Sequence, residues 1–285
     1  MSRFHPSVSW DQFSSTNSSP NQEYTDDSSS IGDGDDESWF SGAGGGSLAD
    51  ASLASVASPQ SFFVPIHYEA NYQYPLLVWL HNDGFNENQI DHVMPHVSTR
   101  NYLATGVRGT RAADSVGHQF DWHDSPAAID AAHDKVLAAV DQACQRYSVH
   151  SSRIILAGYR SGGTMAMRIA MRNPDRFAAV ASLGGRMPSG GKVLANLALL
   201  RKRGLPMLWQ VATASSWFDR QALQSDIRAA MLLRAKVEIR QYSGDDEMNT
   251  AILSDFNHWI MNRIVAGNPP TAEQWQSNPV CFSSN

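Results

Sequence analysis

Cysteine is scarce in this 285-residue chain, which contains only Cys144 and Cys281. Two thiols are too few for a disulfide framework, and Cys144 falls on the apolar face of an expected helix, which predicts a buried free thiol. Long apolar runs are also missing, since no stretch approaches the roughly 20 apolar residues that a membrane span requires. The first residues lack the basic segment followed by an apolar run that marks a secretion signal. We therefore expect a soluble, cytoplasmic protein without a membrane span.

Basic residues are nearly absent from the first part of the chain. Residues 1–60 hold nine acidic residues against Arg3, a net charge of −8, which leaves +2 for the rest of a chain whose total is −6. This Ser/Gly-rich segment cannot bury enough apolar surface to offset its chain entropy, so we expect residues 1–60 to be disordered. Such an acidic tail could recruit a protein partner. The remainder has no basic stripe, which argues against nucleic acid as a partner.

What the sequence does contain is a regular alternation of strand-like and helix-like segments. Apolar runs typical of strands occur at 61–68, 74–81, 102–107, 153–159, 177–183, 205–212 and 236–242. Helical patterns occur at 86–96, 125–147, 164–172, 219–235 and 250–265. This alternation predicts one α/β domain over residues 61–267, with a mostly parallel sheet covered by helices on both faces. Pro65 favours the edge of the sheet for the first strand, and the proline-containing segment 268–285 is expected to be irregular.

The stretch from residue 153 to 185 is the most informative, because a strand meets a helix there through a glycine-rich turn. The turn reads GYRSGG at residues 158–163. A turn of this kind carries the nucleophile in α/β-hydrolases. The stretch resembles the phospholipase/carboxylesterase (dienelactone-hydrolase-like) branch of that superfamily, in which the turn reads roughly G-F-S-x-G-G. The resemblance extends over most of residues 61–266 and implies an α/β-hydrolase fold.

The resemblance also shows which residues stand at the positions of the Ser-Asp-His triad. Arg160 takes the place of the nucleophile, and a guanidinium has no nucleophilic atom. Ser215 takes the place of the acid and Asp246 that of the histidine, so neither supplies the usual chemistry. The neighbouring Ser161 becomes the nucleophile only if the register slides by one, which puts Tyr159 where a small residue relieves the turn. The triad positions are therefore expected to be degenerate, with Ser161 as the fallback nucleophile.

The first turn of the domain, HNDG at residues 81–84, corresponds to the family's H-G-x-G. The resemblance makes His81 a structural histidine rather than a catalytic base. It places Asp83 where the second N–H donor to an oxyanion would lie, while the N–H of Ser161 would be the first. A carboxylate turned toward that place opposes catalysis electrostatically.

Two arrangements of the former site are open. Arg160 and Asp246 could form an ion pair that fills it. Alternatively, Arg160 and the N-terminus of the following helix could bind a small anionic or ester-like ligand. The expected ligand-binding residues are Arg160, Ser161, Asp83, Trp122 and Asp246.

Residues 117–124, GHQFDWHD, precede the long helix and match a family segment that rims the substrate pocket. Phe120 and Trp122 are expected to line the cleft. His118, Asp121, His123 and Asp124 have metal-ligand side chains at short spacing, but helix capping by Asp124 or Ser125 is the simpler interpretation. We expect no metal and no cofactor.

Three functions remain open. The degenerate positions favour a non-catalytic α/β-hydrolase-fold protein that binds a ligand or partner at the former cleft. The alternative is an active carboxylic-ester or thioester hydrolase with a non-standard site built on Ser161, Asp219 or a nearby histidine, although helix capping is the simpler role for Asp219. The third is a scaffold whose acidic tail recruits partners.

Overall fold

The expected alternation of strands and helices is present in the computed structural model, which describes residues 59–190, 195–214, 220–233, 236–245, 247–267 and the backbone of 280–282. All of these residues belong to one compact unit. Nearly all of the segment 1–60 lies outside the described residues, as do Ser215, Asp219 and Asp246. The expected disorder of that segment and the domain limits therefore stay predictions.

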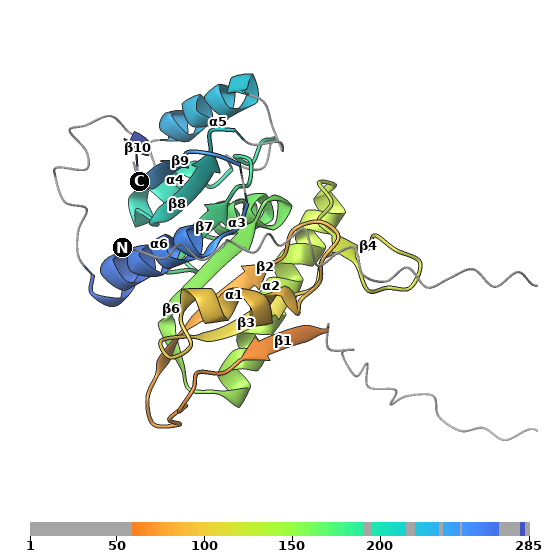
Figure 1. The fold of residues 1–285 in the computed structure, drawn as a ribbon, viewed down its shortest axis with the longest axis vertical. Coiled ribbons are helices and arrows are strands. Elements are labelled where there is room, and N and C mark those ends of the chain that lie inside the picture. Colours follow the sequence, from red (N-terminus) through yellow and green to blue (C-terminus); the bar gives the residue numbers. More distant parts are fainter. Residues whose placement is uncertain are drawn as a thin grey trace, which may run out of the picture. The chain divides into compact units, whose positions relative to one another are not determined.

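The described strands include an eight-stranded sheet in the order β1-β3-β2-β6-β7-β8-β9-β10 (Figure 1). The strands are β1 (Gln60–Phe63), β2 (Tyr74–Leu80), β3 (Leu103–Val107), β6 (Val149–Tyr159), β7 (Ala179–Leu183), β8 (Met207–Ala212), β9 (Val237–Tyr242) and β10 (Val280–Phe282). β1 runs antiparallel to β3, and the other neighbours are parallel. The prediction of a mostly parallel sheet with an edge strand at its start is confirmed. A separate two-stranded hairpin joins β4 (Arg111–Ala112) to β5 (Phe120–Asp121).

Helices cover both faces of the sheet. They are α1 (Gln89–Val97), α2 (Pro126–Arg146), α3 (Ser161–Arg172), α4 (Leu197–Arg203), α5 (Arg220–Leu233) and α6 (Thr250–Ile260), which continues into the π-helical turn η2 (Met261–Val265). α1 packs against α6, and α2 packs against α3. The chain moves outward from β2 to β3 and then returns past β2 to β6, so right-handed crossovers put α1 and α2 on opposite faces. The architecture is that of an α/β-hydrolase fold.

The core is built on the central strands. Every residue of β2, β7 and β8 is buried, which explains why these segments read as continuous apolar runs rather than alternating ones. Within the described residues, no helix is both long and apolar enough to cross a membrane.

The structure corrects the expectation for Cys144, which is exposed rather than buried. The buried face of α2 is formed by the small and branched residues Ala132, Val136, Ala139, Val140 and Ala143. Alanines let the helix approach the sheet closely. Cys144 follows Ala143 by one position and therefore points away from the buried face of the helix.

The tail beyond residue 267 was expected to be irregular, yet Val280–Phe282 pairs with β9 as β10. Its apolar, β-favouring composition is compatible with a strand.

Candidate functional site

The candidate site lies where the strand order reverses, between the carboxyl ends of β2 and β6. Ligands bind at such switch points in open α/β sheets because the loops there diverge to opposite faces. The turn at residues 81–84 follows β2, and Arg160 follows β6 and precedes α3. The ends of β7 and β8 adjoin the same edge, where Arg160 N–H donates to Leu183 O (2.8 Å) and Gly184 N–H donates to Gln210 O (2.8 Å).

The turn at residues 158–163 is as tight as its glycines predict. A Cβ atom on Gly162 would lie 2.2 Å from Leu80 O and 2.3 Å from His81 O. A Cβ atom on Gly163 would lie 2.5 Å from Ser182 Oγ. Both distances are too short for a side chain, so the start of α3 packs directly against the backbone at the end of β2.

Arg160 has the strained backbone of a nucleophile elbow. Its φ of 48° and ψ of −118° lie outside the regions open to residues with a side chain. The conformation is held by the bond to Leu183 O and by Thr164 N–H, which donates to Arg160 O (3.0 Å). Strain of this kind costs about 1–3 kcal/mol and persists only where the surroundings impose it. The turn thus has the geometry that presents a side chain at the carboxyl edge of the sheet, and the side chain presented is a guanidinium.

The two residues at the turn have different surroundings. The Arg160 guanidinium carbon lies 5.1 Å from the centre of the Tyr159 ring, a cation–π contact. The Ser161 Oγ atom is buried and forms no hydrogen bond to a described histidine; it lies beside the Asp83 carboxyl group, where the Ser161 hydroxyl works against the rise in the pKa of Asp83. A serine nucleophile needs a base within hydrogen-bonding reach. No described histidine therefore activates Ser161.

Asp83 turns toward this turn from the β2 side. It is half-buried, and burial raises the pKa of its carboxyl group, with a further contribution from the charge of Asp121. The nearby Ser161 side chain, the Trp122 backbone N–H and the Arg111 guanidinium oppose the rise in pKa without cancelling it. An acidic group therefore lies beside the N-terminus of α3. An oxyanion bound there would need hydrogen-bond donors around it, and a carboxylate would repel it.

His81 is fully buried, and both of its ring nitrogens contact backbone groups. Nδ1 lies 2.7 Å from Asn82 O, and Nε2 accepts a hydrogen bond from Gly109 N–H (2.9 Å). Burial lowers the pKa of His81 to about 4, so the ring is neutral at pH 7. Neither nitrogen is available to take a proton from Ser161. His81 positions the strand ends, as the resemblance implied.

Trp122, expected to line the cleft, is 8% exposed. Its indole N–H donates to His81 O (2.7 Å), and its ring centre lies 5.2 Å from the His81 ring. It therefore acts chiefly as a support for the turn at residues 81–84. Phe120 is half-buried and lies under the Arg108 guanidinium. The centre of its ring is 4.6 Å from the guanidinium carbon.

The two acidic residues of the 118–124 segment take separate roles. Asp121 accepts from Gly84 N–H (3.1 Å) and pairs with Arg111 (3.1 Å). Asp124 pairs with Arg168 (2.6 Å). Ser125 caps α2 by accepting from Ala128 N–H (3.3 Å), as one of the two expected caps. Within the described part of the chain, no three His, Cys, Asp or Glu residues gather as a metal site would require.

A serine–histidine contact is present at a different place in the fold. Ser152 Oγ is 3.1 Å from His150 Nδ1, near the amino end of β6 and on the exposed surface. That end of the sheet is opposite the candidate site, so this pair has no connection with the elbow.

Sequence reasoning missed a polar cluster on the β9 side of the site. Gln210 and Tyr242 lie at the carboxyl ends of β8 and β9 and share Asp255 of α6. A signal was present: Glu238, Arg240 and Tyr242 alternate along β9, which predicts that they share one face. The apolar composition of the neighbouring strands obscured it.

Fold and site together define a protein with an α/β-hydrolase fold and a strained turn between β6 and α3. The profile of the Phospholipase/Carboxylesterase family matches residues 81–213. The chain is similar to that family over those residues, and its fold is that of the α/β-hydrolases.

Individual proteins show similarity of the same kind. NocK of Nocardia uniformis subsp. tsuyamanensis, a protein named as an esterase, is 31% identical over 121 residues, 40% of this chain. The match spans about a third of NocK (34%). The Bacillus cereus carboxylesterase structure has a TM-score of 0.58 at 14% identity and covers 72% of this chain and 94% of its own. Arabidopsis thaliana SOBER1 has a TM-score of 0.54 at 17% identity, over 67% of this chain and 100% of its own. These structural likenesses establish the fold.

Proposed function

We propose that this protein is a non-catalytic member of its superfamily that binds a small anionic ligand, or an anionic group of a partner, at the former active-site cleft. The observation that carries the proposal is Arg160. It occupies the strained elbow position, and it presents a permanent positive charge there instead of a nucleophile.

The surroundings of Arg160 support binding of an anion. The first turn of α3 begins at Ser161, so the unpaired N–H groups and the helix dipole add positive potential at the same point. The guanidinium matches carboxylate and phosphate geometry with paired donors. Asp83 opposes this potential, but its raised pKa makes the carboxyl group easier to protonate when an anion arrives.

The alternative, a hydrolase built on Ser161, has weaker support. Ser161 Oγ forms no hydrogen bond to a described histidine, and His81 is neutral and engaged by the backbone. Loss of triad members costs roughly 10⁴–10⁶ in rate in a related system. Asp219, the substitute acid, and Asp246 lie outside the described residues, so their roles stay part of the proposal.

A sulfate titration of the full chain, followed by thermal unfolding at constant ionic strength, tests the proposal. We expect sulfate to raise the Tm of the wild type and to have much less effect on Arg160→Ala. Arg203→Ala is the matched control, because Arg203 is exposed on α4, where its partner is Asp175 (3.6 Å). An equal sulfate response in all three proteins would contradict an anion site at Arg160.

A p-nitrophenyl ester assay separates the proposal from its alternative. We expect the wild type and Ser161→Ala to show the same background hydrolysis. A clear turnover that Ser161→Ala abolishes would refute the non-catalytic proposal and establish the hydrolase.

A further inference from the structure

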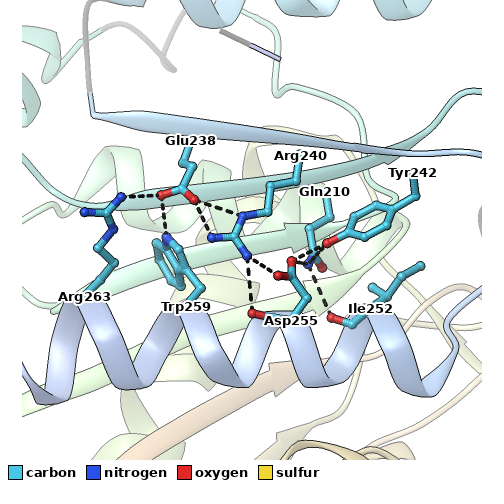
Figure 2. Close-up of polar contacts among 8 residues, drawn as sticks. All are labelled: Gln210, Glu238, Arg240, Tyr242, Ile252, Asp255, Trp259 and Arg263. Carbon is cyan, nitrogen blue, oxygen red and sulfur yellow. Dashed lines mark hydrogen bonds and ion pairs between the residues drawn. The ribbon is translucent and has the colours of Figure 1, made fainter. Parts of the chain in front are cut away.

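A ladder of polar contacts joins β9 to α6 where an apolar interface would be expected (Figure 2). At the end nearest the start of β9, called the lower end below and drawn at the left of Figure 2, Glu238 accepts from Trp259 Nε1 (3.1 Å), Arg263 (3.0 Å) and Arg240 Nε (2.9 Å). Arg240 also pairs with Asp255 of α6. The side chains of Glu238 and Arg240 are only 19% and 17% exposed.

At its upper end the ladder reaches the carboxyl edge of the sheet. Tyr242 OH donates to Asp255. The amide nitrogen of Gln210, a residue only 1% exposed, donates to Tyr242 OH (2.8 Å), to Asp255 (2.9 Å) and to Ile252 O (3.3 Å). Burial, and then the Asp255 carboxylate, raise the pKa of Tyr242, so the phenol stays a proton donor.

This upper end lies next to the elbow. Gln210 and Tyr242 line a small cavity together with Tyr159 and Gly184, the residues that flank the Arg160–Leu183 backbone contact. Gly184 N–H donates to the carbonyl of Gln210 (2.8 Å). Gln210, whose side chain belongs to the ladder, is therefore bonded through its backbone to Gly184. Gly184 directly follows Leu183, which accepts the N–H of Arg160.

The same end also holds the loops that leave β8 and β9. Thr213 N–H donates to Tyr242 O (3.0 Å), and Ala214 N–H donates to Gly244 O (2.9 Å). These two bonds tie the loop after β8 to the turn after β9. Displacement of Tyr242 would therefore move both loops at the edge of the candidate site.

The polar composition of the ladder calls for a reason other than stability. Apolar residues of similar volume often replace buried ion pairs at no cost in stability, and α6 already buries Leu253, Phe256 and Ile260. Directional hydrogen bonds do what apolar contacts do not: they fix the orientation and register of the joined elements.

We propose that Tyr242 and Asp255 are positioning residues of the candidate site, which they serve by fixing the loops after β8 and β9 against the elbow that carries Arg160. The inference rests on the proposed anion site. The upper end of the ladder performs this role, and the lower end joins α6 to the sheet without affecting the site.

The test compares three variants of the full chain. Tyr242→Phe cuts the upper end alone, whereas Asp255→Asn also weakens the pair with Arg240; both keep the shape of the side chain. Trp259→Phe cuts one hydrogen bond at the lower end and is the matched control. Sulfate affinity is measured by calorimetry, Tm by thermal unfolding, and amide exchange at Thr213 and Ala214 by NMR or mass spectrometry.

We expect Tyr242→Phe and Asp255→Asn to weaken sulfate binding about fivefold, the scale of one net hydrogen bond, and to lower amide protection at Thr213 and Ala214. Trp259→Phe should lower Tm at least as much, because it also leaves a cavity at a side chain that is only 2% exposed, while sulfate affinity stays within about twofold, since the change lies far from the site. Equal loss of affinity in all three variants, or unchanged affinity in Tyr242→Phe, would overturn the inference.

Failure of the anion site itself gives a different result. If wild-type protein binds no sulfate, the proposed function fails, and amide exchange still decides the role of the ladder. Protection at Thr213 and Ala214 that is lost in Tyr242→Phe but kept in Trp259→Phe supports positioning. Protection that responds equally to both substitutions shows that the ladder is only structural.

Discussion

The strained backbone of Arg160 leads to a prediction about glycine at that position. At φ 48° and ψ −118°, any residue with a Cβ atom stores strain, which costs about 1–3 kcal/mol. Glycine adopts the conformation without this cost, although its freer unfolded chain costs about 0.5–1 kcal/mol relative to alanine. Arg160→Gly should therefore be more stable than Arg160→Ala by about 1 kcal/mol.

The comparison between these two variants isolates the backbone. Both remove the guanidinium together with its cation–π contact to Tyr159, so the loss of those contacts cancels. For a domain of this size, about 1 kcal/mol shifts Tm by roughly 2–4 °C. Thermal unfolding of the two variants by circular dichroism, under one buffer condition, measures the difference.

The outcome also bears on function. A more stable Arg160→Gly variant means that the chain tolerates strain in order to present a side chain at the elbow, as functional sites commonly do. If Arg160→Gly is instead less stable than Arg160→Ala, the backbone at this turn is not strained, and the elbow conformation is no indication of a retained site.

Three further predictions address the site. Asp83→Asn should raise Tm at pH 7, because the raised pKa of Asp83 means that its ionised carboxylate destabilises the fold. The variant should lose this advantage below the ordinary carboxyl pKa of 3.8, where the carboxyl group is protonated in both the folded and the unfolded chain. An advantage of equal size at pH 7 and pH 3.5 would contradict this. Gly162→Ala should lower stability by about 3 kcal/mol or more, visible as a large fall in Tm, since its Cβ would meet Leu80 O at 2.2 Å; a change of less than about 1 kcal/mol would show that the contact relaxes easily. If Arg160 and Asp246 form an ion pair, the double variant of Arg160→Ala and Asp246→Ala should lose about 1 kcal/mol less stability than the sum of the two single losses. A double variant that loses the full sum would exclude the pair.

Local patterns predicted much of the fold. Continuous apolar runs of seven or eight residues gave β2, β7 and β8 to within two residues at each end, because strands buried on both faces favour apolar side chains at most positions. The short helix α4 was missed, since three consecutive basic residues in its last turn hide its single buried residue, Leu200. The contact between the tail segment Val280–Phe282 and β9 is non-local, so no nearby residue indicates it.

The sequence by itself determined that a glycine-rich elbow follows β6 and that arginine stands in it. Glycines at 158, 162 and 163 specify a close approach of backbones whatever surrounds them, and a guanidinium cannot act as a nucleophile in any surroundings. Only the tertiary structure decided which groups gather around that arginine. It turned Asp83 toward Ser161, engaged both nitrogens of His81 with backbone, and joined Tyr242 to Asp255 across two elements. Such contacts depend on side-chain direction and on segments distant in sequence, which neither composition nor spacing records.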